Sequence, residues 1–328
     1  MFIKYDDESI RYTGRWDLGD KDSATTTAPG SMVEVAFKGK AAVLHFSMEM
    51  NMYPYPHIWI IVDEGAKIES VVNHVIRVET IEAGEHVVKV IYKSAVEIQP
   101  RWYRPLIGKV RFLGADVEER ACLPEDNRRI IEFIGDSITE GVAVDMAYTQ
   151  EQYGQFNRPN QDDATATYAY LTAMNLGRKP VIMGYGAVGV TKSGAGSVPK
   201  ASEAYPYIFE GSLYQSCNPE LIVINHGAND CKADPEEFAQ GYLELLQIVR
   251  KLNPNAKIAV VTSFGGPHLD FLKEPLKTLI ETFNKENKDQ IYYIDSSGWR
   301  ERGPVHPSRE EHVLLAKRLT EALKNILS

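Results

Sequence analysis

Four residues of this sequence are of the types that the hydrolysis of an ester requires. Ser137 could supply a nucleophile, because a serine hydroxyl attacks a carbonyl once a base takes its proton. His306 is our candidate for that base, since an imidazole titrates near neutral pH. The backbone N–H groups of Ser137 and Gly189 and the side-chain amide of Asn229 could bind the oxyanion that forms, each contributing roughly 3–4 kcal/mol in such sites.

Each of these residues also has a more ordinary explanation when it is taken alone. A lone Gly-Asp-Ser sequence is more often a turn than a nucleophile, and His306 could be a surface residue before a helix. Gly189 could serve only close packing of a strand against a helix, and Asn229 could be a turn residue. The catalytic interpretation gains support from where the four stand relative to the predicted strands.

The second part of the chain alternates apolar strands with helices. Continuous apolar runs are typical of a parallel sheet that is buried on both faces. They occupy residues 130–134, 180–184, 221–225, 257–262 and 290–294, with helical patterns at about 164–176, 234–253, 271–287 and from 308 to the end. The helices that begin after Asp234 and Ser308 have capping-box patterns. We therefore predict an α/β domain with a parallel sheet between two layers of helices.

Ligands of an open parallel sheet bind outside the carboxyl ends of its strands. The candidate nucleophile, glycine, asparagine and histidine follow the first, second, third and fifth predicted strands, so all four fall on one edge of one sheet. His226 and Trp299 lie on the same edge and are candidates for substrate binding.

The first part of the chain has a different pattern, in which short β-rich runs alternate with turn residues. The runs are 32–37, 42–48, 57–62, 75–80, 86–94 and 107–113. Their spacing predicts an all-β sandwich or jelly-roll domain over 1–118, joined by a polar connector to the second domain at 129–328. An aromatic run at 53–59 could be a platform for a sugar, or could pack in the core or between the domains.

Composition excludes several classes of partner. The formal net charge is −9, whereas phosphate backbones and anionic lipid surfaces attract basic proteins. The three cysteines form no CxxC pair, which favours a reducing compartment. The sequence as given shows no signal peptide and no transmembrane run. We expect a cytoplasmic protein that binds neither nucleic acid nor membranes.

Two other interpretations of the same sheet edge are weaker. His226, His268 and Asp230 could in principle hold a metal ion, but no HxH or HExxH spacing supports one. The glycines of 184–189 fit a GxGxxG pattern, yet no acidic residue follows at the distance that a dinucleotide site needs. We expect no metal and no cofactor.

The same residues carry a resemblance to the SGNH (GDSL-type) hydrolases. Residues 134–141, IGDSITEG, are similar to the first sequence block of that family, and Gly189, Asn229 and His306 fall in motifs that resemble its second, third and fifth blocks. The resemblance covers about 129–328 and implies a flavodoxin-like α/β/α hydrolase domain. It also implies that Ser137 is the nucleophile, His306 its base, and Ser137, Gly189 and Asn229 the oxyanion hole.

The front part is similar to carbohydrate esterase family 2, in which a jelly-roll domain precedes the hydrolase domain. The similar stretches are residues 12–16, YTGRW, and 28–31, APGS, followed by the β-rich region. This resemblance implies an acetyl esterase that deacetylates small or oligomeric saccharides without a cofactor.

One position departs from the family pattern. The fifth block usually reads Asp-x-x-His, but Gly303 stands three residues before His306. In a serine protease triad, loss of the correct histidine tautomer costs about 10⁴ in rate. Asp295 or Glu301 could orient the imidazole instead. A backbone carbonyl could also do so, as is described for some family 2 esterases.

Two alternatives to an acetyl esterase remain at this stage. A lipase-like or thioesterase-like hydrolase with the same machinery would act on longer acyl chains. A non-catalytic carbohydrate-binding protein would explain the missing aspartate, although the intact nucleophile, base and oxyanion residues argue against it.

Overall fold

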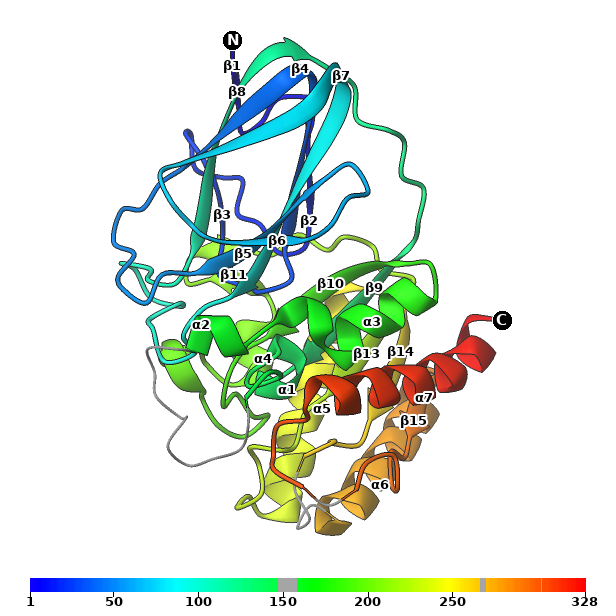
Figure 1. Ribbon diagram of the computed structural model, residues 1–328. Helices are drawn as coiled ribbons and strands as arrows, with labels where there is room; N and C mark the ends of the chain where they lie inside the picture. The colour runs from blue at the N-terminus through cyan, green and yellow to red at the C-terminus, as the bar shows by residue number, and fades with distance from the viewer. Residues whose placement is uncertain (147–157, 266–269, 302) are drawn as a thin grey trace.

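The structure is a computed structural model that describes residues 1–146, 158–265, 270–301 and 303–328. Figure 1 shows an antiparallel sheet at the top, formed by the first part of the chain, and a parallel sheet with its helices below. The two parts predicted from the sequence are therefore present, each with the predicted kind of sheet.

The first part forms one eight-stranded antiparallel sheet. Its main path runs β1-β8-β4-β7-β5-β6, and β2 and β3 pair with β4 and β8. The strands are β1 (Phe2–Lys4), β2 (Ile10–Thr13), β3 (Ala24–Thr26), β4 (Met32–Phe46), β5 (His57–Val62), β6 (Ile68–Val71), β7 (Val75–Ser94) and β8 (Val110–Arg120). Its apolar side chains form a core of their own around Val35, Leu44 and Phe112.

Two turns predicted in this part were wrong. Turns were expected between the predicted runs 32–37 and 42–48 and between the runs 75–80 and 86–94, whereas β4 and β7 continue through both places. Gly39 pairs with Gly84 at this point, and the register shifts between Gly39 and Ala41. Gly39 has a positive φ of 140°, which glycine adopts without strain. The glycines therefore form an irregularity that bends a long hairpin, instead of a turn that ends it.

The second part contains the parallel sheet, with the strand order β10-β9-β13-β14-β15. All five strands lie within one or two residues of the predicted runs: β9 (Ile130–Gly135), β10 (Lys179–Gly184), β13 (Leu221–Asn225), β14 (Lys257–Val261) and β15 (Ile291–Ile294). In chain order this is a 2-1-3-4-5 sheet, which binds ligands where the order reverses, between its first and third strands. Here that place is the carboxyl edge between β9 and β13.

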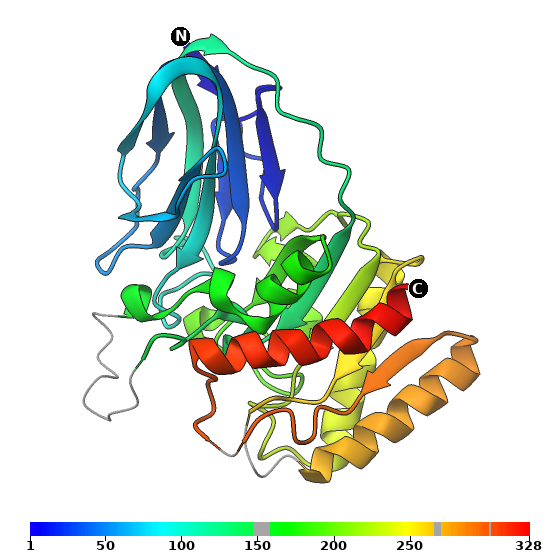
Figure 2. The same ribbon diagram turned by 45° about the vertical axis from the view of Figure 1, so that its right-hand side comes forward.

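Helices pack on both faces of this sheet. Alternate strand residues divide between two apolar clusters: Phe133 lies with residues of α3 and α7, and Ile134 lies with residues of α4, α5 and α6. Figure 2 shows α7 crossing in front of the strands. The helical segments are α1 (Ser137–Glu140), α2 (Arg158–Gln161), η3 (Ala164–Ala166), α3 (Tyr168–Asn175), η4 (Ala195–Ser197), α4 (Ala201–Ala204), α5 (Pro235–Leu252), α6 (Asp270–Asn287) and α7 (Arg309–Leu327).

The predicted helices differ from the observed ones mainly at their ends. The capping box at Ser308 is confirmed, and Asp234 caps α5 by accepting from the N–H of Glu236. The segment predicted as one helix over 164–176 divides at Thr167, whose side chain caps α3. A short hairpin of β11 (Tyr207–Phe209) and β12 (Ser212–Leu213), and the short helix α4 before it, had no periodic signal. None of the helices in the described ranges is long and apolar enough to cross a membrane.

Buried contacts join the two parts of the chain. Two ion pairs between fully or almost fully buried side chains cross this boundary, Arg15 with Glu132 and Arg101 with Glu140. From the aromatic run, Trp59 donates its Nε1–H to Asp163 across the boundary (3.1 Å). The tyrosines Tyr53 and Tyr55 of the same run are exposed. The run therefore packs between the parts through Trp59 and faces solvent through its tyrosines.

Candidate active site

The candidate nucleophile begins a helix of a single turn at the end of β9. Asp136 caps this turn, because its buried carboxylate accepts the N–H of Ile138 at 3.0 Å. Burial raises the pKa of Asp136 to about 7. The turn ends at Gly141, which has a positive φ of 93° and lies so close to the Asp163 carbonyl that a Cβ would overlap it. These local features hold Ser137 at the carboxyl edge of the sheet, as predicted.

Ser137 and His306 are in hydrogen-bond contact. The loop between β15 and α7 brings the His306 Nε2 to 2.9 Å from the Ser137 Oγ. Burial lowers the pKa of His306 to about 4, and the positive charges of Arg158 and Arg300 lower it further in the same direction. The imidazole is therefore neutral at neutral pH and can accept the serine proton.

Arg300 contacts the loop that carries the histidine, a role that no sequence pattern indicated. Its guanidinium donates to the backbone carbonyls of Val305 (3.1 Å) and His306 (3.3 Å). It also donates to Glu311 (2.7 Å), and Glu311 in turn accepts the N–H of Ser308. The capping box of α7 is thus connected to the loop that carries the candidate base.

The two carboxylates proposed as orienters of His306 lie in other surroundings. Asp295 accepts the N–H of Ser297 at 2.9 Å and lies 4.0 Å from the ammonium group of Lys273. Glu301 is exposed to solvent. The orienting role of either residue stays a prediction.

The loop that follows β13 and the loop that follows β10 meet around Asp230. The buried carboxylate of Asp230 accepts the N–H groups of Val190 (3.2 Å) and Thr191 (2.9 Å) and the hydroxyl of Thr191 (2.6 Å). Beside it, Asn229 donates its Nδ2–H to the carbonyl of Val188 (3.0 Å), which fixes the plane of its amide. The structure therefore brings Asn229 next to the loop that contains Gly189.

Gly189 lies against Asp230, since a Cβ at position 189 would overlap the Asp230 Oδ1 atom. Only glycine allows this close approach. Its N–H, which the sequence analysis assigned to the oxyanion, donates to the carbonyl of Lys192 (3.1 Å). The oxyanion role of Gly189 stays a prediction, and it requires that this N–H be shared between the two acceptors.

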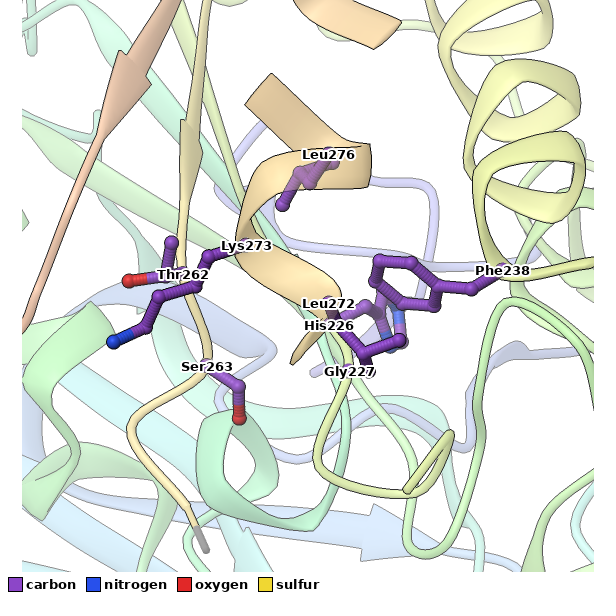
Figure 3. Close-up of a pocket in the computed structure, with 8 residues that line it drawn as sticks. All are labelled: His226, Gly227, Phe238, Thr262, Ser263, Leu272, Lys273 and Leu276. Atoms are coloured by element: carbon purple, nitrogen blue, oxygen red, sulfur yellow. The ribbon is translucent and has the colours of Figure 1, made fainter. Parts of the chain in front are cut away.

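The two candidate substrate residues have different surroundings. His226 is buried and lines a small pocket that is partly open to solvent, with Phe238, Ser263, Leu272 and Lys273 among the other lining residues (Figure 3). Burial lowers the pKa of His226 to about 4.

Trp299 is stacked on Phe264, with 6.1 Å between the ring centroids, and packs against the apolar cluster beneath α7. Its surroundings are those of a packing residue, and substrate contacts for both residues stay predictions. His268 lies outside the described residues. Among the described ones, no three His, Cys, Asp or Glu side chains are grouped as a metal would require.

The neutral imidazole has a consequence for the pH dependence of activity. Acylation needs the unprotonated base, so activity is lost as the pH falls through the pKa of His306 in the folded protein. We expect kcat/KM for p-nitrophenyl acetate to be level between about pH 6 and 7.5 and to reach half its plateau near pH 4. An inflection near 6.5, the ordinary imidazole value, would contradict this. Circular dichroism at each pH separates titration from unfolding.

Comparison with known proteins identifies the class to which this site belongs. Residues 133–313 match the GDSL-like lipase/acylhydrolase family, and the chain belongs to that family. The family and the ester-hydrolase class predicted from the sequence are thereby confirmed.

Two curated relatives match almost the whole length of the chain. It is 29% identical over 98% of its length to the cellulase/esterase CelE of Acetivibrio thermocellus, and 23% identical over 99% to an acetylxylan esterase/glucomannan deacetylase of Cellvibrio japonicus. The chain spans 40% of the first relative's length and 91% of the second's.

A solved structure of a family two carbohydrate esterase from Clostridium thermocellum, in complex with cellohexaose, has a similar fold. Its TM-score with this chain is 0.78, at 27% sequence identity, and the match covers 97% of this chain and 99% of that one. The match therefore includes the antiparallel sheet as well as the parallel one, and the predicted resemblance to carbohydrate esterase family 2 is confirmed.

Proposed function

We propose that this chain is a serine esterase that removes short acyl groups, acetyl above all, from saccharides. The observation that carries the proposal is the 2.9 Å contact between the Ser137 Oγ and the Nε2 of a neutral His306. The names of the relatives, which include an acetylxylan esterase and a glucomannan deacetylase, support the choice of an acetylated saccharide.

The reaction proceeds in two halves. The Ser137 Oγ attacks the acyl carbonyl carbon while its proton passes to the His306 Nε2. The C–O bond to the sugar then breaks, and His306 returns the proton to the leaving sugar oxygen. In the second half His306 takes a proton from water, and the water oxygen attacks the acyl carbonyl carbon. The C–O bond to the Ser137 Oγ then breaks, and His306 returns the proton to that oxygen as the carboxylic acid leaves.

The oxyanion of each tetrahedral intermediate is held by amide groups around Ser137. The N–H of Ser137 is the first of its helical turn, where N–H groups have no partner within the helix. The second donor is the Asn229 amide, whose orientation is fixed by its bond to Val188. Gly189 adds a third donor when its N–H is shared with the oxyanion.

We expect Asn229→Ala to lower kcat for p-nitrophenyl acetate by about 10²–10³-fold with little change in KM, as loss of one oxyanion donor does elsewhere. Steady-state kinetics on the purified variant measure this directly. A fall confined to KM would mean that Asn229 binds the ground state and does not stabilise the intermediate.

The substrate class is tested with a series of acyl chains and with saccharides. We expect hydrolysis rates of p-nitrophenyl esters to fall from acetate to butyrate to octanoate. We also expect acetate release from acetylated xylan and glucomannan, measured by an enzyme-coupled acetate assay. An enzyme that prefers octanoate, or that leaves every acetylated saccharide intact, would contradict the deacetylase proposal.

One observation favours the second candidate function, a hydrolase of longer acyl chains. The pocket in Figure 3 is lined by His226 and Gly227, which precede Asn229 in the same loop. Its apolar lining residues include Phe238, Leu272 and Leu276. An acyl chain that entered it would be recognised by burial of its methylene groups, at about 0.8 kcal/mol each. A preference for butyrate or octanoate in the same series would support this candidate.

We further propose that the domains extend over 1–118 and 129–328, the first a jelly roll and the second an α/β/α layer structure. These limits are supported by the strands on either side of the connector, since β8 ends at Arg120 and β9 begins at Ile130. Limited proteolysis tests these limits: cleavage within the connector that leaves both fragments folded would support them.

A further inference from the structure

The helical turn that carries Ser137 depends on contacts outside itself. α1 has only four residues, and a helix of one turn has too few internal hydrogen bonds to be stable alone. All four of its residues are buried. Its position is therefore set by contacts of the turn and of the residues that flank it. Three of these contacts lie within the parallel-sheet part: the Asp136 cap, the close approach of Gly141 to Asp163, and a 2.8 Å hydrogen bond between Thr139 and Tyr168.

The fourth contact comes from the other part of the chain. Glu140, the last residue of α1, forms a 2.5 Å ion pair with the Nη1 of Arg101, which lies in the connection between β7 and β8. The side chain of Arg101 is fully buried, and that of Glu140 is 3% exposed. The guanidinium also lies over the ring of Tyr185, 5.4 Å from its centroid, and the Arg101 N–H donates to the Gly196 carbonyl (3.1 Å).

We propose that Arg101 is a positioning residue for the nucleophile, acting through Glu140. The antiparallel part of the chain thereby completes the catalytic site, because it supplies a buried ion pair at the far end of the Ser137 turn. This inference rests on the proposed function, since it assumes that Ser137 is the nucleophile.

The physical argument is that this pair cannot be opened without moving α1. Removing the guanidinium leaves the Glu140 carboxylate buried without its closest counter-charge, and a buried unpaired charge moves toward water or becomes protonated. Because α1 is one turn long, a movement of Glu140 also moves Ser137. The Ser137 Oγ must meet an imidazole that is held by a separate loop, and a displacement of about 1 Å in such a site can cost about 10²-fold in rate.

The chain offers a matched control in its other buried ion pair between the two parts. Arg15 lies 3.5 Å from Glu132, and both side chains are fully buried. Arg15 also lies over the ring of Tyr214 (3.6 Å), and Glu132 accepts the hydroxyl of Tyr205 (2.8 Å). Glu132, however, is in the middle of β9, which is paired on both sides with β10 and β13, so losing this pair has no comparable route to Ser137.

The test compares Arg101→Met with Arg15→Met in the full chain. For each variant, three quantities are measured: the melting temperature, kcat and KM for p-nitrophenyl acetate, and the second-order rate of covalent labelling of Ser137 by a fluorophosphonate. We expect both variants to melt at lower temperature. Only Arg101→Met should show a loss of about 10²-fold in kcat and in labelling rate, with KM within about 3-fold of wild type.

Two further variants keep the test decisive if Arg101→Met does not fold. Glu140→Gln removes the charge but keeps the shape, and it should lower kcat by about 10-fold or more. Arg101→Lys restores a positive charge without the planar fork, and it should recover part of the lost rate.

The proposal would be overturned if the Arg101 and Glu140 variants had the same kcat per folded molecule as the Arg15 variant. The proposed esterase function would not be affected by that result. Failure of the proposed function has a different signature, because the wild type would then be inactive or Ser137→Ala would retain full activity. In that case the positioning role falls with it.

Discussion

Replacing Ser137 with alanine is expected to abolish ester hydrolysis, with kcat for p-nitrophenyl acetate lowered by at least about 10⁴-fold. The reason is that the substitution removes the atom that forms the acyl-enzyme, so that only direct attack by water within the oxyanion hole remains. KM should change little, because the hydroxyl contributes to bond formation more than to ground-state binding. Steady-state rates, with a burst measurement for the acyl-enzyme, test this.

The control for this variant is Ser297→Ala. Ser297 is an exposed serine in the loop after β15, at the same edge of the sheet, where it donates to Asp295. Its replacement should leave kcat within about 3-fold of wild type. If Ser137→Ala kept wild-type activity, the serine mechanism would be wrong. If neither protein hydrolysed esters but both bound an acetylated oligosaccharide equally, the non-catalytic carbohydrate-binding interpretation would replace it.

The candidate catalytic residues were predictable as a group because their position follows from strand order. Buried parallel strands have continuous apolar runs, and each run ends where a loop must follow. Ser137, Asn229 and His306 come directly after such runs or after the last of them, so the rule for parallel sheets placed them on one edge. The 2.9 Å contact of Ser137 with His306 is what that placement required.

The residues that support this chemistry were not predictable in the same way. Arg300, Asp230 and Arg101 act through partners in other loops or in the other part of the chain, and a single long-range pair leaves no periodic trace in a sequence. The bond of the Gly189 N–H to Lys192 had no sequence signal either, because it depends on how a loop without regular structure turns back. Local patterns thus identified the candidate reacting groups, and tertiary contacts decide how these groups are held.

The absence of the fifth-block aspartate agrees with the low pKa of His306. An aspartate beside the histidine of a triad stabilises the imidazolium and raises its pKa. Position 303 holds glycine instead, while Arg158 and Arg300 place positive charge near His306 and lower its pKa to about 4. In the proposed mechanism, His306 is therefore a weaker base than a triad histidine, but it is unprotonated at neutral and mildly acidic pH. Arg300 contacts the backbone of the histidine loop, where it donates to the carbonyl of His306 (3.3 Å).

Replacing His306 with alanine is expected to lower kcat by about 10⁴–10⁶-fold, and the Ser137→Ala/His306→Ala double variant should be no slower than either single one. The two residues act as one unit, so once either is missing the other has no function left to lose. Replacing the exposed His74 gives the control, which should keep wild-type rates.

The pairing of Ser137 with His306 can also be tested by chemical rescue. Free imidazole can occupy the space left by the His306 side chain and accept the Ser137 proton, so it should restore part of the activity of His306→Ala in proportion to its concentration. The same imidazole should restore nothing to Ser137→Ala, because no nucleophile is present. Additive losses in the double variant, or equal rescue of both single variants, would mean that the contact between Ser137 and His306 is not the one through which the proton moves.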